Sequence, residues 1–182
     1  GGWERAGSRL CGPLAGGILI VILTWMPAAA EMQVLPGAAA DLDQATVNDV
    51  LATFQRAEKA LHARDVDGMM ALYSEQYDYH GLKKADMRKV WTNLFDEFQE
   101  LSDTHHFSRF IKVGSGAKTI IEVTCTGSLS GLSKTSGLRV PIDSWYEEVH
   151  YMTFEDGQWR IRGNVGDAPR VMPFGTSPHP LF

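Results

Sequence analysis

The chain has 182 residues, 44% of them hydrophobic, and a formal net charge of -5. These values are typical of one globular domain with a core of its own. Charged residues make up 21% of the chain and form no basic block, so we expect no binding to nucleic acid.

The first thirty residues have the composition of an export signal. Arg5 and Arg9 precede an apolar run over 14–26, and Pro27 with three alanines follows it. A basic start, a short apolar middle and an Ala-x-Ala end are typical of a secretory signal peptide. The run is also short for a membrane span of about 20 residues. We therefore expect an exported protein, periplasmic or secreted, without a stable membrane anchor after cleavage; an uncleaved anchor is the alternative.

Composition divides the remaining chain into three parts. Residues 31–44 contain Pro, Gly and several Ala and are expected to form a linker. Residues 45–165 are the expected folded domain. Residues 166–182 hold four prolines, which cannot continue a sheet as a regular strand, and form a Pro-rich tail.

Apolar residues at helical spacing predict three helices in the first half of the domain. The first is expected over 47–64, with Thr46 and Asp49 as a capping box. A short second helix over 66–73 follows Asp65 as its cap. The third, over 83–100, carries an aromatic stripe that is more typical of a core than of a ligand site.

A short strand is expected between the second and third helices. There Tyr77 and Tyr79 would face one way, and Asp78 and His80 the other. Alternating residues beyond Leu101 then predict four further strands. Their expected ranges are 104–113, 118–130, 138–154 and 158–162.

The last two strands form a hairpin around Asp156-Gly157, a preferred pair for a type I′ turn. This turn would place Phe154 opposite Trp159, Met152 opposite Ile161 and His150 opposite Gly163. The other side of the long strand, with Trp145, Val149 and Tyr151, is apolar as well. A sheet that is apolar on both faces needs two partners, so we expect a homodimer through the outer face of the sheet.

The order of these elements resembles the nuclear transport factor 2-like superfamily, including its SnoaL-like members. The resemblance covers residues 45–163 and depends on the first helix, Asp65-Val66-Asp67-Gly68, the stretch 73–81 and the 156–161 hairpin. It implies an α+β, cone-shaped fold in which three N-terminal helices pack on a curved antiparallel β-sheet, with a pocket at the wide end. Ketosteroid isomerases, scytalone dehydratases and polyketide cyclases share this fold with members of no known catalysis, so the fold does not settle the function.

Four ionisable residues are candidates for a catalytic base or acid: His150 and Glu148 on the hairpin face, and Asp78 and His80 on the short strand. A His150 bonded to Glu148 at the edge of the core, and an Asp78–His80 pair on a solvated rim, are the structural alternatives. His105 and His106 point to opposite faces of a strand and cannot share one ion, so we predict no metal site and no cofactor. Cys125 is expected to act as a small buried hydrophobe.

The function expected first is binding of a small, mostly apolar molecule in the cone, because an apolar face that ends in ionisable groups is the usual composition of a ligand pocket. The alternatives are a cofactor-independent isomerase, dehydratase or cyclase, and a dimeric interaction module with a filled interior. The expected ligand-binding wall consists of Phe54, Tyr73, Tyr77, Trp91, Phe107, Tyr146, Met152 and Trp159.

Overall fold

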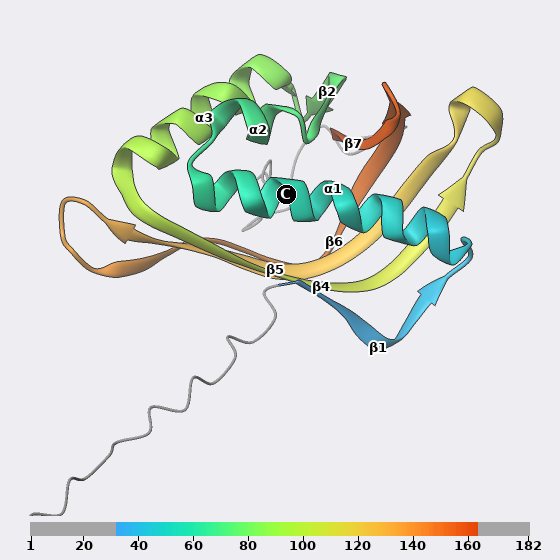
Figure 1. Ribbon diagram of the computed structural model, residues 1–182, viewed down its shortest axis with the longest axis horizontal. Coiled ribbons are helices and arrows are strands. Elements are labelled where there is room, and N and C mark those ends of the chain that lie inside the picture. Colours follow the sequence, from blue (N-terminus) through green and yellow to red (C-terminus); the bar gives the residue numbers. More distant parts are fainter. Residues whose placement is uncertain (1–31, 164–182) are drawn as a thin grey trace, which may run out of the picture.

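The structure, a computed structural model, describes residues 32–163 of the chain (Figure 1). The expected signal peptide and the Pro-rich tail lie outside the described residues. No helix within 32–163 is long and apolar enough to cross a membrane. The elements in chain order are β1 (Met32–Ala40), α1 (Gln44–Ala63), α2 (Val66–Met70), β2 (Tyr73–Tyr79), β3 (Leu82–Lys83), α3 (Lys84–Glu97), β4 (Phe98–Val113), the 3-10 turn η1 (Gly116–Lys118), β5 (Ile120–Ser133), β6 (Arg139–Glu155) and β7 (Gln158–Gly163).

The molecule is a mixed α+β structure with one curved, unclosed sheet. Its strand order is β1-β4-β5-β6-β7-β2-β3. The long strands β4, β5 and β6 are antiparallel, whereas β1 joins β4, and β2 joins β7, in parallel. Figure 1 shows the long strands bending beneath α1, with α2 and α3 farther from them. This agrees with the expected cone-like architecture.

The first helix starts earlier than predicted because its cap is Asp43. The carboxylate of Asp43 accepts a hydrogen bond of 2.7 Å from the backbone N–H of Thr46, so the Thr46–Asp49 capping box is not the start of the helix. The helix ends at Ala63, and the next residue, its C-cap Arg64, has a left-handed φ of 57°. The Arg64 guanidinium then donates to the carbonyl oxygens of Phe98 and Gln99 and joins the end of α1 to the start of β4. Asp65 caps α2 as predicted.

Strand β1 replaces most of the expected linker. Met32–Ala40 pairs with the edge of β4, and the register shifts between Val34 and Ala39, around Pro36 and Gly37. Proline donates no backbone hydrogen bond, which confines it to edges and irregular positions of this kind. The composition of this segment predicted a linker, and the strand was not predicted.

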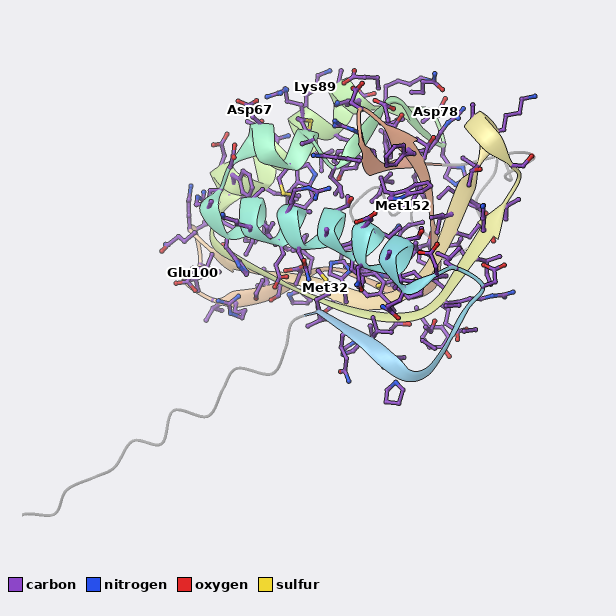
Figure 2. The ribbon with its side chains drawn as sticks, turned by 45° about the vertical axis from the view of Figure 1, so that its right-hand side comes forward. Met32, Asp67, Asp78, Lys89, Glu100 and Met152 are labelled. Carbon is purple, nitrogen blue, oxygen red and sulfur yellow. The ribbon has the colours of Figure 1, made fainter. Side chains whose placement is uncertain are left out.

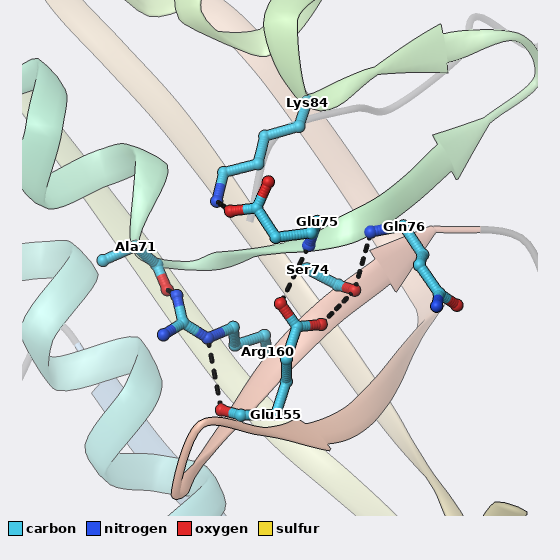
Figure 3. Close-up of polar contacts among 7 residues, drawn as sticks. All are labelled: Ala71, Ser74, Glu75, Gln76, Lys84, Glu155 and Arg160. Atoms are coloured by element: carbon cyan, nitrogen blue, oxygen red, sulfur yellow. Dashed lines mark hydrogen bonds and ion pairs between the residues drawn. The ribbon is translucent and has the colours of Figure 1, made fainter.

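The hairpin between β6 and β7 has the predicted register. Phe154 lies opposite Trp159 and Met152 opposite Ile161. Asp156 and Gly157 both have positive φ, 51° and 78°, as a type I′ turn requires. The carboxylate of Glu155 accepts hydrogen bonds from the Ser74 hydroxyl at 2.6 Å and from the Glu75 N–H at 3.0 Å, which joins the hairpin to β2 (Figure 3).

A β-bulge in β6 changes the predicted faces of that strand. Between the pairs Cys125–Glu148 and Gly127–Trp145, β6 has one residue more than β5, and Glu147 has a φ of 49°. The Thr126 hydroxyl accepts the Glu147 N–H at 3.0 Å. The extra residue reverses the alternation, so Trp145 faces inward, although it was expected on the side away from Phe154.

Candidate functional site

A chain of polar side chains is buried in the core beneath α1. Nε2 of His105 lies 2.9 Å from Oδ2 of Asp103, an ion-pair distance, and Nδ1 of His105 lies 3.4 Å from Sγ of Cys125. All three residues are at most 2% exposed. Buried polar groups are costly unless they have partners, and such groups occur often at functional sites.

Aromatic residues surround this polar chain. The Phe54 ring lies 5.7 Å from the His105 ring and 5.8 Å from the His150 ring, and the Trp145 ring lies 5.4 Å from His105. α1 therefore places one phenyl ring between the imidazoles of β4 and β6. Burial raises the pKa of the Cys125 thiol to about 11, so the thiol is protonated near neutral pH.

Neither Asp103 nor His105 was predicted from the sequence as a site residue. Asp103 precedes the predicted start of the strand at 104, whereas β4 begins at Phe98. In a strand, residues two apart share a face, so Asp103, His105 and Phe107 point together into the core. The pattern Asp-x-His within a longer strand was the signal that could have found the pair.

His150 and Glu148, both predicted, lie on the inner side of β6. His150 is 5% exposed and lies against Phe54. The Tyr79 hydroxyl donates a 3.1 Å hydrogen bond to Oε1 of Glu148. The structure thus brings Glu148 to a tyrosine of β2, and His150 to the aromatic core.

Asp78 and His80, the other predicted pair, lie at the end of β2 and in the β2–β3 turn. Figure 2 shows Asp78 at the periphery of the molecule. The Asp78 carboxylate pairs with Lys83 and accepts the Gly81 N–H at 2.9 Å, and these contacts hold its pKa below the usual value. His80 has a φ of 51° and packs edge-to-face on Tyr79. A carboxylate with a lowered pKa is a weak base, so this pair is better explained as part of the turn.

Most of the expected pocket wall is packed core. The buried members contact one another: Trp91 donates a 2.8 Å hydrogen bond to the Tyr73 hydroxyl, and the Phe54 and Phe107 rings meet at 4.9 Å. Burial raises the pKa of the Tyr73 and Tyr77 phenols, so neither ionises readily. The wall residues that are at most 2% exposed are Phe54, Tyr73, Tyr77, Trp91, Phe107 and Met152.

Tyr146 does not line the interior, and that prediction is wrong. The bulge turns Trp145 inward and leaves its neighbour Tyr146 78% exposed. The Trp145 ring is accommodated because its partner is Gly127, where a β-carbon would lie 2.5 Å from the indole.

Trp159, the remaining member of the expected wall, borders an open cleft of about 760 Å³. The cleft lies between the start of α1, the β4–β5 connection and the end of the β6–β7 hairpin. Ile121 and the Phe154–Trp159 pair, whose ring centroids are 5.2 Å apart, form an apolar side. The Thr53 hydroxyl donates a 2.6 Å hydrogen bond to the Trp159 carbonyl and thereby fixes the hairpin to α1.

The other side of the cleft is charged. Among residues 32–163, it carries the carboxylates of Asp41, Asp43 and Asp49 and the cation of Lys112. Asp41 accepts the backbone N–H of Lys112 at 2.7 Å. The hydrogen bond from the Thr46 N–H lowers the pKa of Asp43, which keeps this carboxylate ionised at neutral pH.

Comparison with solved structures shows the same fold in distant proteins. A conserved protein from Planctomyces limnophilus is 9% identical, with a TM-score of 0.56 over 66% of this chain and 94% of that one. A proposed scytalone dehydratase from Novosphingobium aromaticivorans is 13% identical, with a TM-score of 0.52 over 73% and 95%. Aln2 from Streptomyces is 10% identical, with a TM-score of 0.51 over 67% and 89%.

At such low identity these likenesses establish the fold and no activity. No curated protein matches the sequence significantly. The sequence model of the SnoaL-like domain matches residues 54–161, more than half of the chain and the part that runs from α1 to the final hairpin. The chain therefore belongs to the SnoaL-like family of the nuclear transport factor 2-like superfamily.

Proposed function

We propose that this is an exported protein that binds a small, mostly apolar molecule in the cleft beside Trp159. One observation carries the proposal: Phe154 is 58% exposed and stands next to Trp159 on the apolar side of a cleft of about 760 Å³. Small-molecule sites are concave, largely apolar and of this size, with a few polar groups that fix the orientation. Export rests on the composition of residues 1–30.

The charges of the cleft favour a ligand with a cationic or hydrogen-bond-donating group. Three carboxylates face one lysine there. Asp41 and Asp43 already accept backbone hydrogen bonds, whereas Asp49 lies farther along α1. A cation placed near Asp49 would meet a net negative surface while its apolar part covers Phe154.

Ligand titration followed by tryptophan fluorescence tests this proposal. We expect a panel of aromatic cations, neutral molecules and anions of equal size to change the Trp159 emission in the order cation, neutral, anion. Phe154→Ala should weaken binding by about tenfold, the effect of losing roughly 1.4 kcal/mol of apolar contact. Trp159→Phe should remove the signal.

Tyr146→Ala is the matched control, because Tyr146 is an exposed aromatic residue outside the cleft. Its affinity should equal that of the wild type. A flat response to the whole panel, or equal losses in Phe154→Ala and Tyr146→Ala, would exclude the cleft as the binding site.

The second candidate is a cofactor-independent isomerase, dehydratase or cyclase. The buried Asp103–His105 contact, with His150 on the other side of Phe54, favours it, because a carboxylate can orient an imidazole that moves a proton. Turnover of enolisable and dehydratable substrates should then fall at least a hundredfold in His150→Gln and stay unchanged in Asp78→Asn. Equal rates in both variants and the wild type would remove this candidate.

The third candidate is an interaction module with a filled interior. The packing of Phe54, Trp91 and Phe107 at 0% exposure supports it. The cleft beside Trp159 supports small-molecule binding instead, because an interaction module has no need for a hollow there.

A further inference from the structure

Three metal-ligand side chains converge at the C-terminal half of α1. Glu58 and His62 are four residues apart on this helix and therefore share one face. That face meets Asp103 of β4. One ligand atom from each residue lies within 4.8 Å of the other two.

The environment of Asp103 points to a bound cation. Asp103 is 2% exposed, and its Oδ2 is at ion-pair distance from His105. Its Oδ1 is also buried and has no hydrogen-bond partner among residues 32–163. A buried carboxylate oxygen without a partner is costly, and a metal ion is one of the few groups that compensate the cost.

We propose that Glu58, His62 and Asp103 bind a divalent transition-metal ion of the zinc class. One imidazole with two carboxylates is a ligand set for zinc and similar ions, whereas magnesium and calcium prefer oxygen alone. Zinc lies about 2.0–2.2 Å from such ligands, so the ligand atoms must approach to roughly 3.4 Å. Rotation of the exposed His62 and the half-buried Glu58 can supply this movement, while buried Asp103 stays fixed.

His105 would hold the Asp103 carboxylate in place without binding the ion itself. Ligating carboxylates are usually held by an outer partner, and the His105 imidazole lies at ion-pair distance, 2.9 Å, from Oδ2 of Asp103. The exposure of His62 gives the ion a path from solvent. This inference is independent of the cleft, because Asp49 and Glu58 are nine positions apart on α1, which is about 14 Å along a helix.

Metal binding by the full chain tests the inference. After treatment with a chelator, the protein is titrated with Zn²⁺ by calorimetry and with Co²⁺ by visible absorption. We expect one ion per chain, a rise in the unfolding temperature, and Co²⁺ bands of a site with nitrogen and oxygen ligands. Both His62→Asn and Glu58→Gln should weaken binding by at least about tenfold.

His106→Asn is the matched control, because His106 neighbours His105 but points to the opposite face of β4. Its affinity for zinc should equal that of the wild type. Asp103→Asn removes a core group and can fail to fold, so the decision rests on His62, an exposed residue. The inference is wrong if the wild type binds no ion, or if His62→Asn binds as tightly as His106→Asn.

Discussion

At the scale of single residues, burial decides the chemistry of Cys125. Its side chain is fully buried, and burial raises the pKa of the thiol to about 11 from 9.0. At pH 8 the thiolate fraction is then about a hundredfold smaller than for an exposed thiol, and only the thiolate reacts. We expect Cys125 to react with iodoacetamide at least a hundredfold more slowly in the folded protein than in 8 M urea, as measured by mass spectrometry.

This experiment needs a Cys11→Ser background, so that the rate belongs to Cys125 alone. The urea-unfolded sample is the control for the intrinsic rate. Rapid modification of the folded protein at pH 8 would mean that the thiol is accessible and ionised. It would also be consistent with a nucleophilic role for Cys125, since His105 could act as its base.

The carboxylate of Glu155 makes stability depend on pH. Burial alone would raise its pKa, but the hydrogen bonds from Ser74 and Glu75, with the nearby charge of Arg160, outweigh this and lower it (Figure 3). A lowered folded-state pKa stabilises the fold above the unfolded pKa, near 4.5. This contribution is lost as the pH falls from about 4.5 through the lower folded value.

Glu155→Gln should therefore cost about 1 kcal/mol of unfolding free energy at pH 7, a low value because the carboxylate is partly exposed. The cost should shrink below pH 4.5, as measured by urea unfolding at a series of pH values. Glu147→Gln, at an exposed glutamate of the same strand, is the control. A cost that stays constant from pH 3 to pH 7 would contradict this assignment.

At the scale of elements, two glycines of the final hairpin separate backbone strain from steric clash. Gly157 has a φ of +78° with open space around it, whereas a β-carbon on Gly163, at φ +87°, would lie 2.2 Å from the Asp78 carbonyl oxygen. Gly157→Ala should cost about 1–2 kcal/mol from the left-handed backbone alone. Gly163→Ala should cost clearly more, because β2 must also move away from β7; equal costs in urea unfolding would contradict this.

Elements that depend on adjacent residues were predicted from the sequence. Elements whose structure depends on a strand distant in the sequence were not. The Asp156-Gly157 turn and the Asp65 cap need only adjacent residues, and both were predicted correctly. Strand β1 depends on the free edge of β4, and the bulge at Glu147 depends on the opposite Thr126 hydroxyl. The hydrophobic periodicity of one segment carries no information about its pairing partner. The linker and the position of Tyr146 were therefore predicted wrongly.

At the scale of the whole molecule, the candidate site was predicted in part. The His150 ring does lie against Phe54 of α1, and the Trp159 side chain does pack against the core on that side and border the cleft. Whether aromatic residues line a hollow or fill it depends on how closely the helix approaches the sheet. Periodicity identifies the inner face, but it does not give that distance. The cleft beside Trp159 is therefore a feature that only the assembled fold defines.

The outer face of the sheet, opposite α1, is the expected surface for dimerisation. We propose that it forms a homodimer, but a weak one, because its central residues bear hydroxyl groups: Thr104 bonds Ser128 at 3.0 Å, and Ser102 bonds Ser130 at 3.1 Å. Among the described residues of this side, Tyr146 is the large aromatic residue that is mostly exposed, whereas Tyr151 is half-buried. Stable interfaces bury about 800 Å² per partner around such anchors, and a polar surface gains less from burial.

Sedimentation velocity of the chain should accordingly show a monomer at low micromolar concentration and a dimer in the range of about 0.1–1 mM, where the binding free energy is roughly 4–6 kcal/mol. Tyr146→Ser should abolish the dimer, since tyrosine anchors dominate the energy of small interfaces. Phe154→Ser is the control, because this exposed aromatic residue borders the cleft on the opposite side of the sheet. A monomer at every concentration would contradict the proposal. If only Phe154→Ser abolished the dimer, the interface would instead lie at the tip of the β6–β7 hairpin.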